Sequence, residues 1–156
     1  FPGWFGRFVC AHFAPFLDEP VRTAEQRKAF ETVIEYLDGV TFKLPEDLQA
    51  YLEETEDVLD GDVLSKINSA LAQAVQNPEA YIEENRGIIE QYRAVTSSAE
   101  YQASAAGRMQ AALKRLLAEA GYNDVFIPAM RRLSPKYAQY YTALQEANAA
   151  FVEALQ

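Results

Sequence analysis

The residue types that most often carry out chemistry in proteins are scarce in this chain. Its 156 residues include one histidine, His12, and one cysteine, Cys10. Residues two positions apart on a helix do not face each other, so this pair is not expected to form a Cys–His nucleophile. The usual zinc sites need four Cys or His ligands, or three and a water molecule, which this chain does not supply. We expect His12 to be a structural residue at the rim of a hydrophobic core, satisfied by one hydrogen bond.

Carboxylates are the only abundant reactive groups, and they concentrate between residues 46 and 62. This stretch holds eight acidic residues and no basic one. Its Asp60-Gly61-Asp62 centre suggests a calcium-binding loop. With the glycine at the sixth loop position, however, three positions that must supply oxygen ligands are occupied by Val58, Leu64 and Ile67. We therefore expect a solvated acidic face and no metal site; a looser divalent-cation site between helices is the alternative.

Other signatures of catalysis are missing as well. Adjacent carboxylates such as Glu53-Glu54 and Glu83-Glu84 point away from each other on a helix, so they are poorly placed for acid–base chemistry. The sequence has no Gly-x-Ser-x-Gly motif, no phosphate-binding glycine-rich loop and no dinucleotide-binding fingerprint. We predict that the protein is not an enzyme and uses no cofactor.

The most distinctive segment is the aromatic N-terminus, residues 1–17. It contains the only tryptophan and five of the nine phenylalanines. Its apolar residues recur at the spacing of one helix face, which predicts a helix over residues 3–14 that ends at Pro15. We interpret residues 1–17 as an arm or docking helix and residues 18–156 as the helical bundle domain. The candidate partner-binding residues are Trp4, Phe5, Phe8, Phe13 and Phe16.

Capping patterns divide the rest of the chain into helices. Thr23 to Gln26 and Ser97 to Glu100 have the spacing of a capping box, and Asn77-Pro78 and Ser134-Pro135 are typical helix starts. Three glycines mark expected helix ends: Gly39, Gly61 and Gly121. The chain has no convincing strand pattern. We therefore predict an all-α fold, a single-domain bundle of six to eight short helices.

Apolar spacing predicts which helix faces point into the core. The expected rows are Phe30, Val33, Ile34 and Leu37 after Thr23; Tyr81, Ile82, Ile88, Ile89, Tyr92 and Val95 after Asn77; and Tyr137, Tyr141, Leu144, Asn148, Phe151 and Leu155 after Ser134. Gly87 and Gly107 interrupt two otherwise good helices. We interpret both glycines as places where helices approach closely; room for a ligand is the alternative.

Charge and hydropathy exclude some partner classes. The net charge is −9, divided into −11 over residues 1–106 and +2 over residues 107–156. An acidic surface repels a phosphate backbone, so nucleic acid is not an expected partner. The longest uncharged run near the N-terminus has ten residues, too few for a transmembrane helix. Because the chain begins with Phe1 rather than Met, we interpret it as a soluble processed protein or an excised fragment, and its compartment is unknown.

Two functions fit these patterns. We favour protein–protein interaction, as an accessory subunit of a larger assembly or a soluble binder, because aromatic residues dominate the binding energy of interfaces. The alternative is a carrier of a hydrophobic ligand such as a fatty acid or other lipid, held between short amphipathic helices. Alanines around Gly107 favour close packing, so we expect a filled core without a pocket near Gly87 and Gly107.

Overall fold

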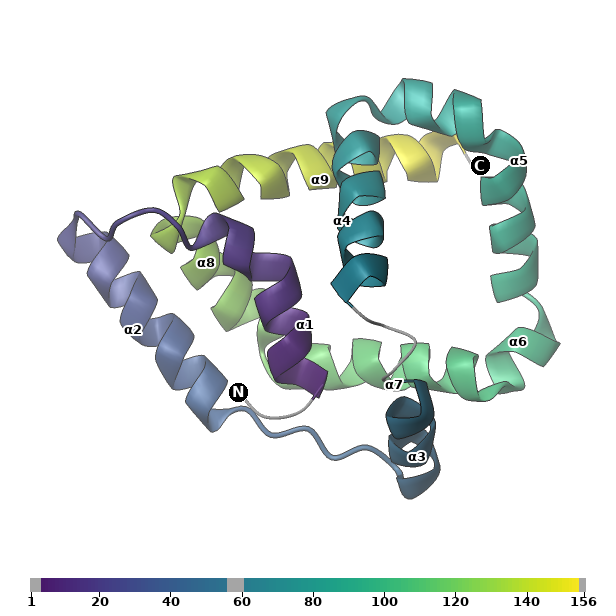
Figure 1. Cartoon of the computed structure of the whole chain (residues 1–156), viewed down its shortest axis with the longest axis horizontal. Coiled ribbons are helices and arrows are strands. Elements are labelled where there is room, and N and C mark those ends of the chain that lie inside the picture. Colours follow the sequence, from purple (N-terminus) through teal and green to yellow (C-terminus); the bar gives the residue numbers. More distant parts are fainter. Residues whose placement is uncertain (1–3, 56–60, 155–156) are drawn as a thin grey trace. The chain divides into compact units, whose positions relative to one another are not determined.

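The computed structural model describes residues 4–55 and 61–154, except for the side chains of Trp4 and of residues 61, 62, 64 and 65 (Figure 1). Within this part the chain forms nine α-helices and no strand, and eight of the helices have seven or more residues. The predicted all-α fold is confirmed. The helices are α1 (Trp4–Phe13), α2 (Ala24–Gly39), α3 (Glu46–Thr55), α4 (Gly61–Gln76), α5 (Pro78–Thr96), α6 (Ala99–Ala103), α7 (Ala105–Glu119), α8 (Ile127–Leu133) and α9 (Pro135–Ala154). A turn of 3-10 helix, Ala14–Phe16, follows α1, and one turn of π-helix, Tyr122–Phe126, precedes α8.

Side-chain caps fix where several helices begin. The Thr23 hydroxyl accepts a hydrogen bond from the amide of Gln26 (3.0 Å), whose side chain accepts one from the amide of Thr23 (3.1 Å). This reciprocal pair confirms the predicted capping box of α2. Asn77 caps α5 by accepting from the amide of Ala80 (3.3 Å). At the end of α7, Gly121 adopts the predicted left-handed conformation with φ +73°.

The long helix predicted from Ser97 onward is in fact two helices, α6 and α7. It begins one residue later, where the Ser98 hydroxyl accepts from the amide of Tyr101 (3.1 Å). Ser104 then interrupts it, donating its hydroxyl proton to the carbonyl of Tyr101 (2.5 Å) and accepting from the amide of Gly107 (3.1 Å). A Cβ at Gly107 would overlap the Tyr101 carbonyl. The close approach expected at this glycine is therefore to the backbone of the preceding helix, and it makes glycine necessary at the break.

The helices group into two compact units, each assembled from two stretches of sequence. Unit 1 comprises residues 1–45 and 112–141, and unit 2 comprises residues 46–111 and 142–156. Because the chain passes from one unit to the other three times, no single cut in the sequence separates them. Residues 1–17 fall in the same compact unit as the residues that follow them.

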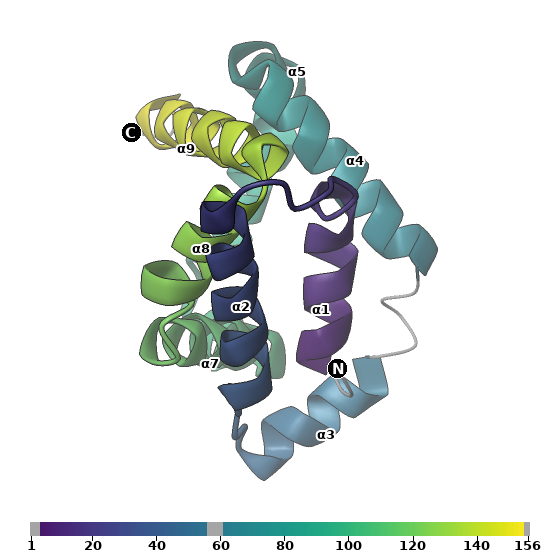
Figure 2. The ribbon, with the colours of Figure 1, turned by 90° about the vertical axis from the view of Figure 1, so that its left-hand side faces the viewer.

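Unit 1 is built around an aromatic core that α1, α2 and α8 enclose (Figures 1 and 2). The fully buried ring of Phe13 stands edge-on to Phe126, with centroids 5.0 Å apart, and lies 5.3 Å from the ring of Tyr137. The buried residues of this core are Phe5, Val9, Phe13, Ala29, Val33, Leu37, Phe126, Ile127, Ala129, Met130, Leu133 and Tyr137. Burying one large apolar side chain contributes about 1.5–3 kcal/mol, so this cluster is the main source of stability in unit 1.

Polar contacts tie the segment after α1 to the start of α9. The ammonium group of Lys136 donates to the carbonyl of Pro15 (2.9 Å) and lies 3.5 Å from the carboxylate of Asp18. Next to it, the buried Ser134 hydroxyl accepts from the amide of Tyr137 (3.1 Å) and so caps α9 at the predicted position. These contacts provide hydrogen-bond partners for the carbonyl of Pro15 and the amide of Tyr137, which lie outside regular helix hydrogen bonding.

The buried face of α2 matches the predicted one in part. Val33 and Leu37 are buried as predicted, whereas Phe30 and Ile34 are exposed and Ala29 is buried in addition. Helix α2 packs on α8, and a small side chain at position 29 lets the two backbones approach closely. The packed row is therefore turned toward the alanine and away from the bulkier Phe30.

Unit 2 buries fewer large side chains than unit 1. Its buried apolar residues, within the part of the chain that is described, are Leu48, Ala74, Ile82, Met109 and Ala147. Helix α4 packs on α5, and Arg108 of α7 forms an ion pair with Asp47 of α3 (2.6 Å). Both charged side chains are about half exposed, so the pair adds little stability. Among the described residues, unit 2 thus has a smaller apolar core than unit 1.

Candidate functional site

The five aromatic residues predicted to bind a partner do not share one surface. Phe13 is fully buried and Phe5 is also buried, both in the core of unit 1. Phe16 packs at the edge of the same core, 5.3 Å from the ring of Tyr137. Phe8 remains exposed at 38%, and the side chain of Trp4 lies outside the described residues. The apolar stripe of α1 therefore serves mainly the protein's own core.

His12 lies half-buried at the rim of that core, between aromatic rings. Its ring is parallel to Phe8 (centroids 5.9 Å apart) and edge-on to Phe13 (4.8 Å). Burial lowers the pKa of His12, because the charged imidazolium loses solvation. Burial likewise raises the pKa values of Tyr122 and Tyr137, two phenols that are neutral at physiological pH even at their ordinary pKa. All three rings pack in or beside the aromatic core of unit 1.

Three of the five large apolar side chains that the described part of unit 2 exposes form a row on α5; the other two are Ile67 and Val152. Ile88 is 69% exposed, Tyr92 61% and Val95 51%. Their spacing of four and then three residues places them on one side of the helix. The sequence predicted all three for the core, and the structure corrects this. Ile88 is adjacent to the half-buried Ile89, and neighbouring residues on a helix point in different directions, so only one of the two faces inward.

Gly87 lies beside this row, and no described part of the chain packs against it. It is exposed, and a Cβ added to it would meet nothing within 4 Å. A glycine inside a helix costs up to about 1 kcal/mol relative to alanine. The predicted explanation, close approach between helices of this chain, is not found among the described residues. At Gly87 the backbone of α5 is therefore accessible to another molecule.

Charge on α5 is also arranged unevenly. Exposed Glu84 lies one turn before Ile88 and so belongs to the same side of the helix. Arg86 lies on the opposite side, where it pairs with Glu83 (3.6 Å). We refer to Glu84, Ile88, Tyr92 and Val95 as the α5 face, and Gly87 lies at its edge. This face is apolar at its centre and acidic at its N-terminal end.

The acidic character of the chain belongs to unit 2 as a whole. Unit 2 contains 15 acidic and 4 basic residues, a formal net charge of −11, whereas unit 1 contains 8 acidic and 10 basic residues, a net charge of +2. Charge is therefore divided between the compact units, each of which combines two stretches of sequence. A net charge of this size steers cationic partners toward the unit that carries it.

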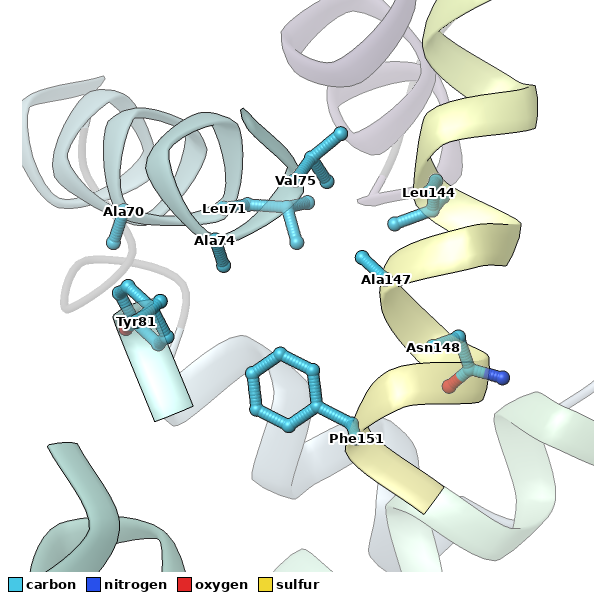
Figure 3. Close-up of a pocket in the computed structure, with 9 residues that line it drawn as sticks. All are labelled: Ala70, Leu71, Ala74, Val75, Tyr81, Leu144, Ala147, Asn148 and Phe151. Carbon is cyan, nitrogen blue, oxygen red and sulfur yellow. The ribbon is translucent and has the colours of Figure 1, made fainter. Parts of the chain in front are cut away.

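Unit 2 also contains a cavity of about 310 Å³ between α4 and α9 (Figure 3). Nine residues line it: Ala70, Leu71, Ala74, Val75, Tyr81, Leu144, Ala147, Asn148 and Phe151. Gly87 and Gly107, near which a filled core was expected, do not contribute to it. We refer to it as the unit 2 cavity.

A second cavity, of about 350 Å³, lies in unit 1 beside Tyr36, Gly39 and Thr41. The Tyr36 hydroxyl is buried and finds no hydrogen-bond partner among the described residues. Its burial raises the pKa of Tyr36. Because the hydroxyl is enclosed, it is not presented to a ligand. Its missing hydrogen bond lowers the stability of unit 1.

The described ranges contain neither a candidate metal-binding cluster nor a membrane-spanning helix. Among these residues, no three His, Cys, Asp or Glu side chains gather where they could hold a metal ion. Residues 56–60 of the acidic run lie outside the described residues. No described helix combines the length and the apolar character needed to cross a bilayer.

Comparison with protein families, curated proteins and solved structures found no match. Function must therefore be argued from the residues of this chain. Sequence reasoning missed the α5 face, because it assigned the apolar residues of this face to the core. Two signals were present in the sequence: the consecutive Ile88 and Ile89, which make the apolar arc too wide for one interface, and the glycine before them.

Proposed function

We propose that the protein acts by protein–protein interaction, without catalysis, and that the α5 face binds an amphipathic helix of a partner protein. The observation that carries the proposal is the exposed row of Ile88, Tyr92 and Val95 beside Gly87. Scattered exposed apolar residues are normal on protein surfaces, but three on one helix face form a continuous apolar strip. Tyrosine is among the residues that contribute most to interface energies, and Tyr92 lies at the middle of the strip.

Gly87 supports a helix as the binding partner. A glycine at a helix surface lets a second backbone come close, and van der Waals contact between the helices then increases. Helix recognition of this kind uses apolar anchors spaced by three and four residues, which is the spacing found on α5. Gly87 lowers the stability of α5, and in exchange it permits closer contact with the partner helix.

Charge supports a partner with basic residues beside its apolar ones. Glu84 lies on the α5 face, Arg86 is turned away from it, and unit 2 carries a net charge of −11. A cationic helix would gain from this field both in its rate of association and in its orientation. A second copy of the chain is disfavoured as partner, because two such faces would bring like charges together.

The probe for this proposal is a fluorescein-labelled helical peptide with leucine on one face and lysine on the other. Fluorescence anisotropy with the full chain is expected to show saturable binding. The same peptide with glutamate in place of lysine is expected to bind about tenfold more weakly or worse. Equal binding of the two peptides would contradict the charge argument and with it the choice of partner.

Two double variants locate the interaction. Ile88→Ser with Val95→Ser removes most of the exposed strip, and the dissociation constant for the lysine peptide should rise at least about tenfold. The matched control is Phe30→Ser with Ile34→Ser, which removes the exposed apolar pair of α2 in unit 1; it should change the dissociation constant by less than about twofold. An equal loss of affinity in both variants would show that the peptide does not bind specifically to the α5 face.

Sedimentation velocity of the full chain tests whether a second copy of the chain binds the α5 face instead. The proposal expects a monomer at micromolar concentration. A dimer that the Ile88→Ser, Val95→Ser variant dissociates would mean that α5 binds a second copy, and the proposal of a basic partner would be overturned.

A further inference from the structure

The unit 2 cavity separates two helices whose facing side chains are almost all apolar. In Figure 3, Leu71 and Val75 of α4 extend toward Leu144 and Ala147 of α9, and Ala74 lines the same space. The rings of Tyr81 and Phe151 approach at one end, with centroids 6.2 Å apart. The cavity therefore has aliphatic walls and an aromatic end.

We infer that the unit 2 cavity binds a small neutral amphiphile, of the class of medium-chain alcohols, with its apolar body between α4 and α9. Its volume of about 310 Å³ falls at the lower end of the range of small-molecule sites. The cavity is partly open to solvent, and a ligand that covered its apolar lining would gain dispersion contacts and remove that lining from water. A molecule as small as an eight-carbon alcohol matches that space better than a full-length lipid.

The polar group of the ligand is placed by Asn148. This residue lies at the edge of the cavity and is exposed, with its amide turned away from α4 in Figure 3. An amide both donates and accepts hydrogen bonds, so it can pair with a hydroxyl whichever way the hydroxyl is oriented. The ligand would thus bury its chain among the aliphatic side chains and keep its oxygen at the rim.

The charge of the surroundings excludes an anionic ligand. None of the nine lining residues is charged, and the unit that holds the cavity carries a net charge of −11. A carboxylate bound here would lose solvation without gaining a cationic partner, which is costly. A fatty acid, the ligand expected of a carrier from the sequence, is therefore a poor fit, and the neutral alcohol is preferred.

The test uses the full chain with labelled methyl groups and two probes of equal chain length, 1-octanol and octanoate. Titration followed by NMR should give saturable shifts of the methyl groups of Leu71, Val75 and Leu144 with 1-octanol. Octanoate should bind at least about tenfold more weakly, because of its charge. Absence of saturable shifts with 1-octanol, or equal affinity for octanoate, would overturn the inference.

Two exposed alanines of α4 provide a matched pair of variants. Ala70 lines the cavity and Ala72 does not, and leucine is a good helix former at either position. Ala70→Leu should fill part of the cavity and raise the dissociation constant of 1-octanol at least about tenfold, whereas Ala72→Leu should leave it within about twofold. Equal effects of the two substitutions would contradict the site. The α5 face takes no part in this experiment, so its result is independent of the proposed function.

Discussion

The ring of Phe13 stands edge-on to the ring of Phe126, with centroids 5.0 Å apart, and neither side chain is exposed to solvent. This contact joins α1 to the π-helical turn before α8, so the aromatic N-terminal helix is part of the core of unit 1. The geometry is the one that aromatic pairs prefer, and it adds to the energy of burial.

Replacing Phe13 by alanine is therefore expected to destabilise the protein by about 3–5 kcal/mol, the usual cost of truncating a buried phenylalanine. Phe8→Ala, at a position that is 38% exposed, should cost about 1 kcal/mol or less. Urea unfolding followed by circular dichroism measures both free energies of unfolding. Similar small losses in the two variants would mean that α1 is a detachable arm.

Alanine substitutions at two helical glycines are expected to have opposite signs. At Gly87 a Cβ meets nothing within 4 Å, so Gly87→Ala should raise the free energy of unfolding by up to about 1 kcal/mol. At Gly107 the Cβ overlaps the Tyr101 carbonyl, and Gly107→Ala should lower it by about 1–3 kcal/mol. Thermal unfolding of the two variants beside the parent chain gives the comparison. A stabilised Gly107→Ala protein would show that α6 and α7 are not broken at Ser104.

Removing the enclosed hydroxyl of Tyr36 should not weaken the fold. The hydroxyl is buried without a hydrogen-bond partner among the described residues, and such a group costs about 1–3 kcal/mol of desolvation. Tyr36→Phe is therefore expected to leave the free energy of unfolding unchanged or to raise it by about 1 kcal/mol. A loss of stability in urea unfolding would mean that the hydroxyl has a partner in solution.

The free energy of unfolding should decrease as the pH is lowered through the range where His12 titrates. Burial holds the pKa of His12 below its ordinary value of 6.5, so the unfolded chain binds a proton more readily than the folded protein. The stabilisation is complete above the ordinary pKa and is lost as the pH falls through the lower, folded value. Between about pH 7.5 and 5.5 the urea midpoint should drop in the parent chain and drop less in His12→Phe. Equal drops in the two proteins would assign the effect to other groups.

Helix starts and ends could be predicted from the sequence because they depend on local chemistry. Thr23, Asn77 and Ser134 cap helices at the predicted positions, and Gly121 ends one in the left-handed conformation. The all-α class followed from the same signals. The break at Ser104 was not predicted, because capping by a single serine within an alanine-rich stretch gives no periodic signal.

Which face of a helix is buried depends on its neighbours, and apolar spacing alone did not decide it. On α2 the small Ala29 is packed and the larger Phe30 is exposed; on α5 the row at Ile88 faces solvent. The grouping into two units was equally hidden, since each unit combines distant stretches of sequence. The candidate site lies on a face that sequence reasoning had assigned to the core, and only burial in the structure distinguishes the two cases.

The most direct test of the proposed function is a map of the lysine–leucine peptide on the full chain by amide chemical shifts. The account predicts that the largest saturable shifts fall on α5, at Gly87, Ile88, Tyr92 and Val95, with smaller shifts elsewhere in unit 2. Saturable shifts centred on α1 or α2, or confined to the acidic helix α3 without α5, would contradict the assignment of the α5 face as the interaction surface.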